Sequence, residues 1–302
     1  MNLFDSFIDL SRLSETDYTL AVAGADHTAT LRSLQQVSAI SNIKPLLFGD
    51  EQKIRSIAKQ IYFSLQSIKI IDVKDHQRAC ELAVDAVTIG EAQVLMKGLV
   101  HTSEFARAVL SKEAGLRRPG RLVTHLGLFD VPYLKKPLFI TDAAVNIAPN
   151  LEKKSIMIGN ALNVMRKLGV ERPRVAVIAP VEEVNPKIQS TVDAAEIVRL
   201  SKSSDIYGDA IIEGPMAIDI ALSAEAGRIK GMDSLVSGDV DLLVCPNLDT
   251  ANAVLKLLSF TPGSRSAGIM TGLKAPIVLT SRSDLEQTRF NSVCMAIRAA
   301  YS

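Results

Sequence analysis

Residues 277–284 have the sequence IVLTSRSD, and this stretch decides how the chain folds around its candidate site. Its apolar half predicts a buried strand, which ends at the hydroxyl of Ser281 and the guanidinium of Arg282. A helical pattern follows, from about residue 284 to residue 300. Ser281 and Arg282 are therefore expected at the carboxyl end of a strand, where open α/β sheets bind ligands, and beside a helix N-terminus, which favours anions. The planar donors of Arg282 suit phosphate, so the stretch predicts a phosphate site.

Strand and helix patterns alternate along most of the chain. Apolar runs near residues 18, 44, 67 and 94 are each followed by helical periodicity, over residues 28–39, 51–63, 75–87 and 103–110. Such alternation predicts βαβ units in a largely parallel sheet. The alternation of strands and helices is then interrupted. Residues 121–131 and 137–141 are typical of two antiparallel strands with no helix between them. Further strands are expected over residues 174–179, 210–214, 241–245 and 275–280.

The length of 302 residues favours two domains. We expect an α/β fold with two doubly wound domains and a cleft between them. Residues 1–138 plus 283–302 are predicted to form the first domain, and residues 139–282 the second. The second domain carries most of the motif residues.

Composition excludes several classes of partner. The net charge of +1 and the absence of Trp argue against nucleic-acid binding. No apolar run approaches ~20 residues, so no membrane span is expected. The three cysteines, Cys80, Cys245 and Cys294, lie far apart in apolar segments, which predicts buried thiols in a cytoplasmic protein. Cys245 ends a strand pattern and is interpreted as a packing residue, with a nucleophile as the less favoured reading.

Polar residues gather after the expected strands. They are His101, Thr102, Asp142, Asn146, Glu182, Asn185, Gly214, Pro215, Asn247, Ser281 and Arg282. This arrangement predicts a binding cleft, although loops after strands are polar in any α/β protein. The G-x-G-x-x-G, P-loop, H-E-x-x-H, C-x-x-C and G-x-S-x-G signatures are absent. We therefore expect no dinucleotide site and no metal.

From residue 141 onward the sequence resembles the phosphate acyltransferases, meaning the phosphate acetyltransferases and especially the phosphate butyryltransferases. The matching stretches are TDAAVNIAP (141–149), VNPK (184–187), TVDAA (191–195), GPMAID (214–219), PNL (246–248) with Asn252, TSR (280–282) and, in the first half, GLVHT (98–102). Each is short, and the ordered set carries the resemblance.

The resemblance implies the reversible reaction of acyl-CoA with phosphate to give acyl phosphate and free CoA. It also implies a two-domain fold like that of the isocitrate and isopropylmalate dehydrogenases, with the site in the interdomain cleft. It further implies a homo-oligomer that uses no metal, forms no covalent acyl-enzyme and needs no cofactor beyond CoA as a substrate.

The implied reaction assigns roles to particular residues, because attack of phosphate on a thioester forms a tetrahedral oxyanion that must be stabilised. Arg282 is expected to neutralise the phosphate, and Ser281 and Asn247 to donate hydrogen bonds to the reacting oxygens. The expected substrate-binding residues are Gly98, His101, Thr102, Arg107, Asp142, Asn146, Gly214, Pro215 and Gly272.

The general base is the point where this sequence departs from the family pattern. In the acetyltransferase branch, an Asp seven residues beyond the motif serine accepts the proton of the CoA thiol, and Thr288 occupies that position here. Glu286 or Asp284 is a candidate replacement, although Glu286 also completes a capping box with Ser283. The butyryltransferase branch shares the departure, so we assign the chain to that branch, with butyryl or acetyl as the acyl group.

Other readings stay open. His101 can be a loop residue that orients Thr102, and Asp142 and Asn146 can cap the helix that follows them. The alternative function is a catalytically degraded protein that binds acyl-CoA or phosphate. A nicotinamide-dependent dehydrogenase of the same fold is a third candidate, but it requires a cluster of Asp residues that the sequence does not show.

Overall fold

The computed structural model describes residues 2–10, 17–40, 43–111, 115–118, 121–279 and 284–301. The protein is a mixed α/β chain that divides into two compact units, and each is described by itself. The first, called here the 124–266 unit, comprises Met1–Phe7 and Thr124–Ser266. The second, the 8–123 unit, comprises Ile8–Val123 and Ala267–Ser302. The expected domains, residues 1–138 plus 283–302 and residues 139–282, have other bounds and remain a prediction.

The strands of the 8–123 unit run in the order β3-β2-β1-β4-β11-β10. Neighbours are parallel in β3 to β11, and β10 is antiparallel to β11. The strands are β1 (Tyr18–Ala23), β2 (Ile43–Gly49), β3 (Lys69–Asp72), β4 (Val94–Lys97), β10 (Arg265–Thr271) and β11 (Ile277–Val278). Since β2 and β4 lie on opposite sides of β1, the winding of the chain reverses at the β1/β4 boundary. This is the switch point at which doubly wound sheets bind ligands.

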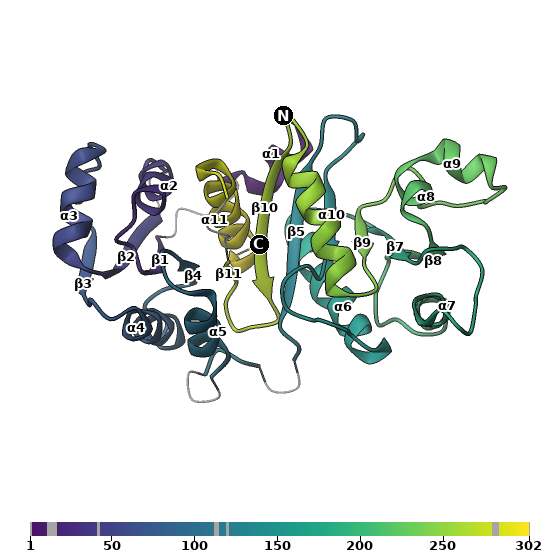
Figure 1. The fold of residues 1–302 in the computed structure, drawn as a ribbon, viewed down its shortest axis with the longest axis horizontal. Helices are drawn as coiled ribbons and strands as arrows, with labels where there is room; N and C mark the ends of the chain where they lie inside the picture. The colour runs from purple at the N-terminus through teal and green to yellow at the C-terminus, as the bar shows by residue number, and fades with distance from the viewer. Residues whose placement is uncertain are drawn as a thin grey trace. The chain divides into compact units, whose positions relative to one another are not determined.

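The helices of this unit cover both faces of its strands. They are α2 (Thr28–Ser38), α3 (Glu51–Gln60), α4 (His76–Thr88), α5 (Thr102–Leu110) and α11 (Glu286–Tyr301). Figure 1 shows α2, α3 and α11 on one face and α4 and α5 on the other. Asp50 caps α3 through the amide of Lys53, and Asp75 caps α4 through the amide of Arg78. The four predicted strand–helix repeats are confirmed.

The 124–266 unit has the strand order β5-β6-β9-β7-β8. Its strands are β5 (Thr124–Asp130), β6 (Leu138–Thr141), β7 (Arg174–Ile178), β8 (Ile211–Met216) and β9 (Leu242–Val244). The predicted antiparallel pair is confirmed as β5 with β6, and the other neighbours are parallel. Buried side chains from all five strands, Phe129, Ile140, Ala176, Met216 and Leu243, join one core cluster.

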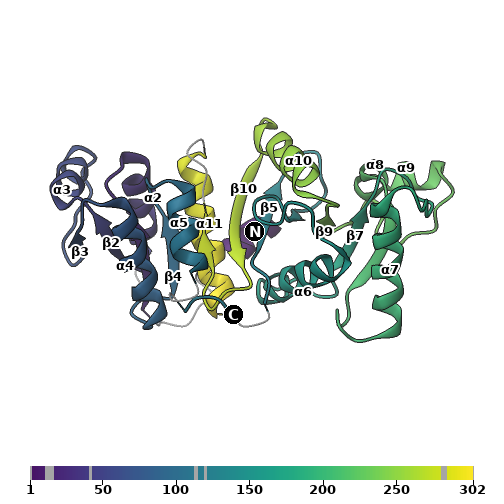
Figure 2. The ribbon, with the colours of Figure 1, turned by 60° about the horizontal axis from the view of Figure 1, so that its bottom comes forward.

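The helices of the 124–266 unit also lie on two sides. They are α1 (Leu3–Ile8), α6 (Leu151–Lys167), α7 (Gln189–Ser203), α8 (Ile218–Leu222), α9 (Ala224–Ile229) and α10 (Leu248–Phe260). The view in Figure 2 separates α6 and α7 from α8, α9 and α10. Among the described helices, none has both the length and the hydrophobicity that crossing a bilayer requires.

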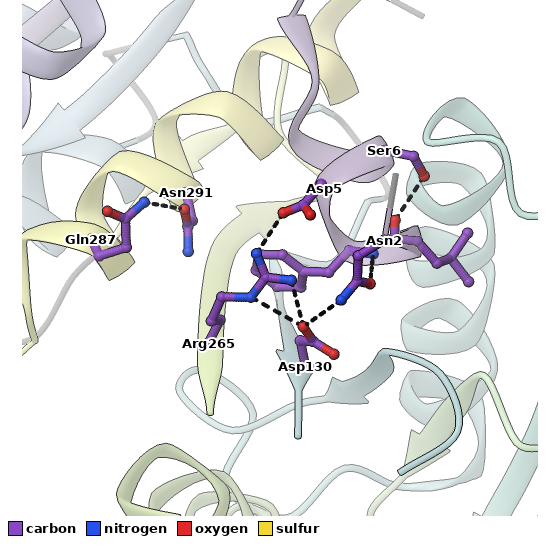
Figure 3. Close-up of polar contacts among 9 residues, drawn as sticks. Asn2, Asp5, Ser6, Asp130, Arg265, Gln287 and Asn291 are labelled. Carbon is purple, nitrogen blue, oxygen red and sulfur yellow. Dashed lines mark hydrogen bonds and ion pairs between the residues drawn. The ribbon is translucent and has the colours of Figure 1, made fainter. Parts of the chain in front are cut away.

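Arg265 fixes the start of the chain to this unit (Figure 3). Its guanidinium lies 2.5 Å from a carboxylate oxygen of Asp5 and 2.5 Å from one of Asp130. The same group stacks 4.6 Å from the ring centre of Phe4, whose side chain is fully buried. These contacts explain why Met1–Phe7 belongs to this unit although the chain then enters the other one.

Candidate functional site

The carboxyl ends of β1, β4 and β11 share one edge of the 8–123 unit because these three neighbouring strands are parallel. The loops after β1 and β4 are joined there by hydrogen bonds from the Gly98 amide to the Ala23 carbonyl (2.8 Å) and from the Leu99 amide to the Gly24 carbonyl (2.8 Å). Ser281 and Arg282 follow β11 in sequence but lie outside the described residues. Their proposed roles therefore remain predictions.

Gly98 is required by this backbone contact. A Cβ atom built at residue 98 would lie 2.1 Å from the Gly24 carbonyl oxygen and 2.8 Å from the Ala23 carbonyl oxygen. Neither backbone oxygen can move without separating the loops that follow β1 and β4. This packing accounts for the glycine without a ligand, so a direct substrate contact at Gly98 stays a prediction.

We expect Gly98→Ala to destabilise the protein by roughly 1–3 kcal/mol, the usual cost of overpacking, and to lower activity by displacing the loop that leads to Thr102. The matched control is Gly159→Ala, inside α6, where a Cβ meets nothing within 4 Å. There the substitution should raise helix stability, by up to ~1 kcal/mol. Thermal unfolding of both variants checks the pair, and equal midpoints would contradict the packing argument.

His101 and Thr102 lie at the start of α5, and Arg107 lies in its last turn. His101 is its N-cap residue, and the Glu104 carboxylate accepts from the His101 amide (3.3 Å). Thr102 is the first helical residue and is exposed. Arg107 is also exposed, but five residues along a helix place it about 140° around the axis from Thr102. Within α5, therefore, His101 and Thr102 lie together at the carboxyl edge of the strands and Arg107 does not share their face.

Asp142, Asn146 and Asn247 come together in the 124–266 unit, because β6 and β9 are neighbours. The Asp142 carboxylate is buried and accepts from the amides of Ala144 (2.9 Å) and Val145 (3.0 Å) and from the Asn146 side chain (2.6 Å). The helix after this loop begins at Leu151 and is capped by Asn150. The interpretation of Asp142 and Asn146 as caps of that helix is therefore wrong: they organise the preceding loop instead.

Asn247 caps α10. Its side-chain oxygen accepts from the Thr250 amide at 3.0 Å, and the residue is half-buried. Capping uses the side-chain oxygen and leaves the amide nitrogen as the donor, which is the group the predicted oxyanion contact requires. Helix capping and substrate binding are thus compatible at this residue.

The predicted glycines have local structural reasons. Gly214 lies in β8 at φ 157°, and a Cβ there would be 2.8 Å from the Val177 carbonyl oxygen. Pro215 beside it is buried. Gly272 has φ 84° in the turn between β10 and β11. In the strand order, β8 is separated from β9 by β7, so Gly214 and Pro215 are not adjacent to Asn247.

A pocket of about 1030 Å³ opens beside Asn247, between the first turns of α6 and α7. Its lining includes Pro149, Leu151, Val184 and Val192. The charged groups at its wall are Lys154 with Asp193 and Arg199 with Glu196, and each cation is paired with its anion. Because these charges cancel, the pocket suits an uncharged chain better than a free phosphate ion.

Lys154 and Asp193 form a buried ion pair that the sequence interpretation missed. Their charged atoms are 2.6 Å apart, and their side chains are only 5% and 8% exposed. The Gln189 side chain also donates to Asp193 at 2.8 Å. The available signal was a lysine in the first turn of a helix, where a cation opposes the helix dipole and needs a nearby anion.

Glu286, the candidate base, begins α11. Its side chain is 42% exposed and lies 3.7 Å from Arg32. Its proposed capping partner, Ser283, lies outside the described residues, so neither the capping role nor the base role is tested. Thr288, in the position of the family Asp, uses its carbonyl to accept from the Ser292 hydroxyl at 2.7 Å.

Burial raises the pKa of the Cys245 thiol to about 12. At neutral pH the residue is a thiol and not a thiolate, which supports the packing interpretation. Among the described residues, no cluster of three or more His, Cys, Asp and Glu side chains could hold a metal ion.

Comparison with known proteins defines the class of this chain. Residues 74–297 match the family model described as phosphate acetyl/butaryl transferase. The chain is also 42% identical over 292 residues to a phosphate butyryltransferase of Clostridium beijerinckii, covering 96% of both proteins. The chain therefore belongs to the phosphate acetyl/butyryl transferase family, which is a family of acyltransferases.

Solved structures agree with this assignment. The crystal structure of a branched-chain phosphotransacylase from Enterococcus faecalis V583 superposes with a TM-score of 0.82 at 28% identity, covering 94% of this chain and 99% of that one. A 4-hydroxythreonine-4-phosphate dehydrogenase from Klebsiella pneumoniae matches with a TM-score of 0.57 at 14% identity, over 94% of this chain and 100% of that chain. The second likeness shows only that the fold is related to a dehydrogenase fold.

Proposed function

We propose that the protein transfers a short acyl group, butyryl or acetyl, between CoA and inorganic phosphate by direct attack in a ternary complex. Family membership supports the reaction class. The observation that carries the proposal is the shared edge of β1, β4 and β11. It joins the GLVHT stretch to the strand that precedes Ser281 and Arg282, although these stretches lie far apart in sequence.

In this proposal, Arg282 binds the phosphate, and Ser281 and Thr102 donate hydrogen bonds to phosphate oxygens. The Asn247 side-chain nitrogen donates to the carbonyl oxygen that becomes the oxyanion, where a fixed donor strengthens as charge develops. Acyl-CoA, phosphate and acyl phosphate are then the only partners needed for chemistry, and no cofactor takes part. The interdomain cleft that the family resemblance implies is part of the same proposal.

Release of free CoA thiol tests this function. We expect release from acetyl-, propionyl-, butyryl- or longer acyl-CoA only when phosphate is present, and the best substrate identifies the branch. If acyl-CoA binds but no thiol is released at any chain length, the protein is the degraded binding protein. Stabilisation against heat by a nicotinamide nucleotide would instead favour the dehydrogenase alternative.

We also propose a homo-oligomer in the cytoplasm. On α10, the exposed residues Ala253, Leu257 and Phe260 recur at helical spacing, and Leu257 and Phe260 are 69% and 81% exposed. Burial of this apolar stripe against a second copy would remove it from water. A monomer mass in sedimentation equilibrium would contradict the proposal.

A further inference from the structure

The proposed reaction needs a base for the CoA thiol, and we propose that His27 is that base. This inference rests on the proposed function and names a residue that the family pattern did not supply. His27 ends the loop after β1, at the same edge of the 8–123 unit as Thr102 and the end of β11.

The loop that carries His27 is held at this edge by backbone hydrogen bonds. It follows Gly24, whose carbonyl accepts from Leu99 (2.8 Å), and the His27 amide donates to the Ala25 carbonyl (2.8 Å). A positive φ of 70° at Gly24 makes the turn, and a Cβ there would lie 2.5 Å from the Val100 side chain. The loop is therefore tied directly to the segment that leads to Thr102.

The His27 ring is available for chemistry. His27 is the N-cap residue of α2, yet its side chain makes no capping hydrogen bond. The residue is only partly buried, so part of its surface is open to solvent. Serine, threonine, aspartate and asparagine are the usual N-cap residues, so helix capping alone gives no reason for a histidine here.

Helix α11 lies close to His27. Helix α11 starts four residues after Arg282 and packs against α2, as Figure 2 also shows. It brings the buried Arg289 side chain close enough to act on His27 electrostatically. By contrast, Glu286 on the same helix is half-exposed and directed to Arg32.

The surroundings keep His27 neutral at physiological pH. Burial and the positive charge of Arg289 lower the pKa of His27 below its usual 6.5, against a smaller opposing effect of Asp26. A histidine with such a pKa is an unprotonated acceptor at pH 7, which is the state a general base must have.

The step starts from acyl phosphate and the CoA thiol. A His27 ring nitrogen takes the thiol proton while the sulfur forms a bond to the acyl carbon. The bond from that carbon to the phosphate oxygen then breaks, and the His27 proton passes to the leaving oxygen. The products are acyl-CoA and hydrogen phosphate, and His27 is neutral again.

The test compares His27→Asn with wild type in the direction that consumes acyl phosphate and CoA. Asparagine is a good N-cap residue, so α2 keeps its start, and His27→Ser provides a second capping-competent variant. We expect kcat/KM for CoA at pH 7 to fall about 10²–10⁴-fold, the usual contribution of a general base. The matched control is His76→Asn, at the first residue of α4, which should retain the wild-type rate.

The pH profile separates a base from a merely structural residue. In wild type, kcat/KM should fall as the pH falls through the lowered His27 pKa and be flat above it. Without a base the reaction requires the thiolate, so the variant rate should rise tenfold per pH unit up to the thiol pKa, near 8.5.

Three results would overturn the inference. They are a rate for both His27 variants within a few-fold of wild type, a variant profile parallel to that of wild type, or the same thiolate dependence appearing in Glu286→Gln instead. None of these affects the proposed function, which fails only if wild type itself shows no phosphate-dependent thiol release.

Discussion

Arg282→Ala is expected to lower kcat/KM for phosphate-dependent thiol release by about 10³-fold or more, in the range seen when a transition-state arginine is removed from a phosphoryl site. β11 ends at Val278, four residues before Arg282 in the sequence, and its carboxyl end shares an edge with β1 and β4. Both substrates are anions and need a positive charge near them. Arg107, the other candidate cation, does not share the face of α5 that carries Thr102. Removal of Arg282 therefore leaves the phosphate without its proposed counter-charge.

Arg282→Lys distinguishes charge from geometry. Lysine keeps the charge but loses the two-pronged donor arrangement, so it should recover only part of the activity. The control is Arg78→Ala on α4, whose side chain is 55% exposed and pairs with Glu81 three residues on. If Arg282→Ala retained more than a tenth of wild-type activity in the thiol assay, the phosphate role of this residue would be excluded.

The strands could be predicted where apolar residues were continuous. β1 and β4 are completely or almost completely buried, and such runs are typical of parallel strands between two helical layers. β10 was not predicted, because RSAGIMT combines Arg, Ser and Gly with few apolar residues. It is the antiparallel neighbour of β11 in the sheet, and the side chains of its own seven residues do not signal that pairing.

The strand ends that carry the candidate residues could be predicted from the sequence, whereas the roles of those residues remain predictions. The edge after β4 and the edge shared by β6 and β9 lie where the polar residues indicated. The sequence could not show that residue 98 must be glycine because the backbone of Gly24 packs against it. Nor could it show that the Asp142 carboxylate accepts hydrogen bonds from the amides of its own loop. His27 was missed because a lone histidine after a strand carries no motif, and its relation to Arg289 exists only after α11 packs on α2.

The largest effect on stability is expected at the buried pair of Lys154 and Asp193. Asp193→Leu should destabilise the protein by roughly 3–5 kcal/mol, because it leaves the lysine charge buried without a partner. For a unit of this size the thermal midpoint should fall on the order of 10 °C. Lys154→Met should have a similar effect, since it leaves the carboxylate with the Gln189 hydrogen bond alone.

The double variant Lys154→Met with Asp193→Leu shows whether the single variants lose stability through an unpaired charge or through lost packing. Apolar side chains of similar size remove both charges, so most of the lost stability should return, as is common when a whole buried pair is replaced. Glu196→Ala on α7 is the control: its partner Arg199 is 62% exposed, so the thermal midpoint should hardly change. If the double variant is as unstable as the sum of the two single variants, then packing and not charge pairing holds α6 to α7. If both single variants keep the wild-type midpoint, the two charges are not buried against each other. The pocket wall beside Asn247 is then not stabilised by this ion pair.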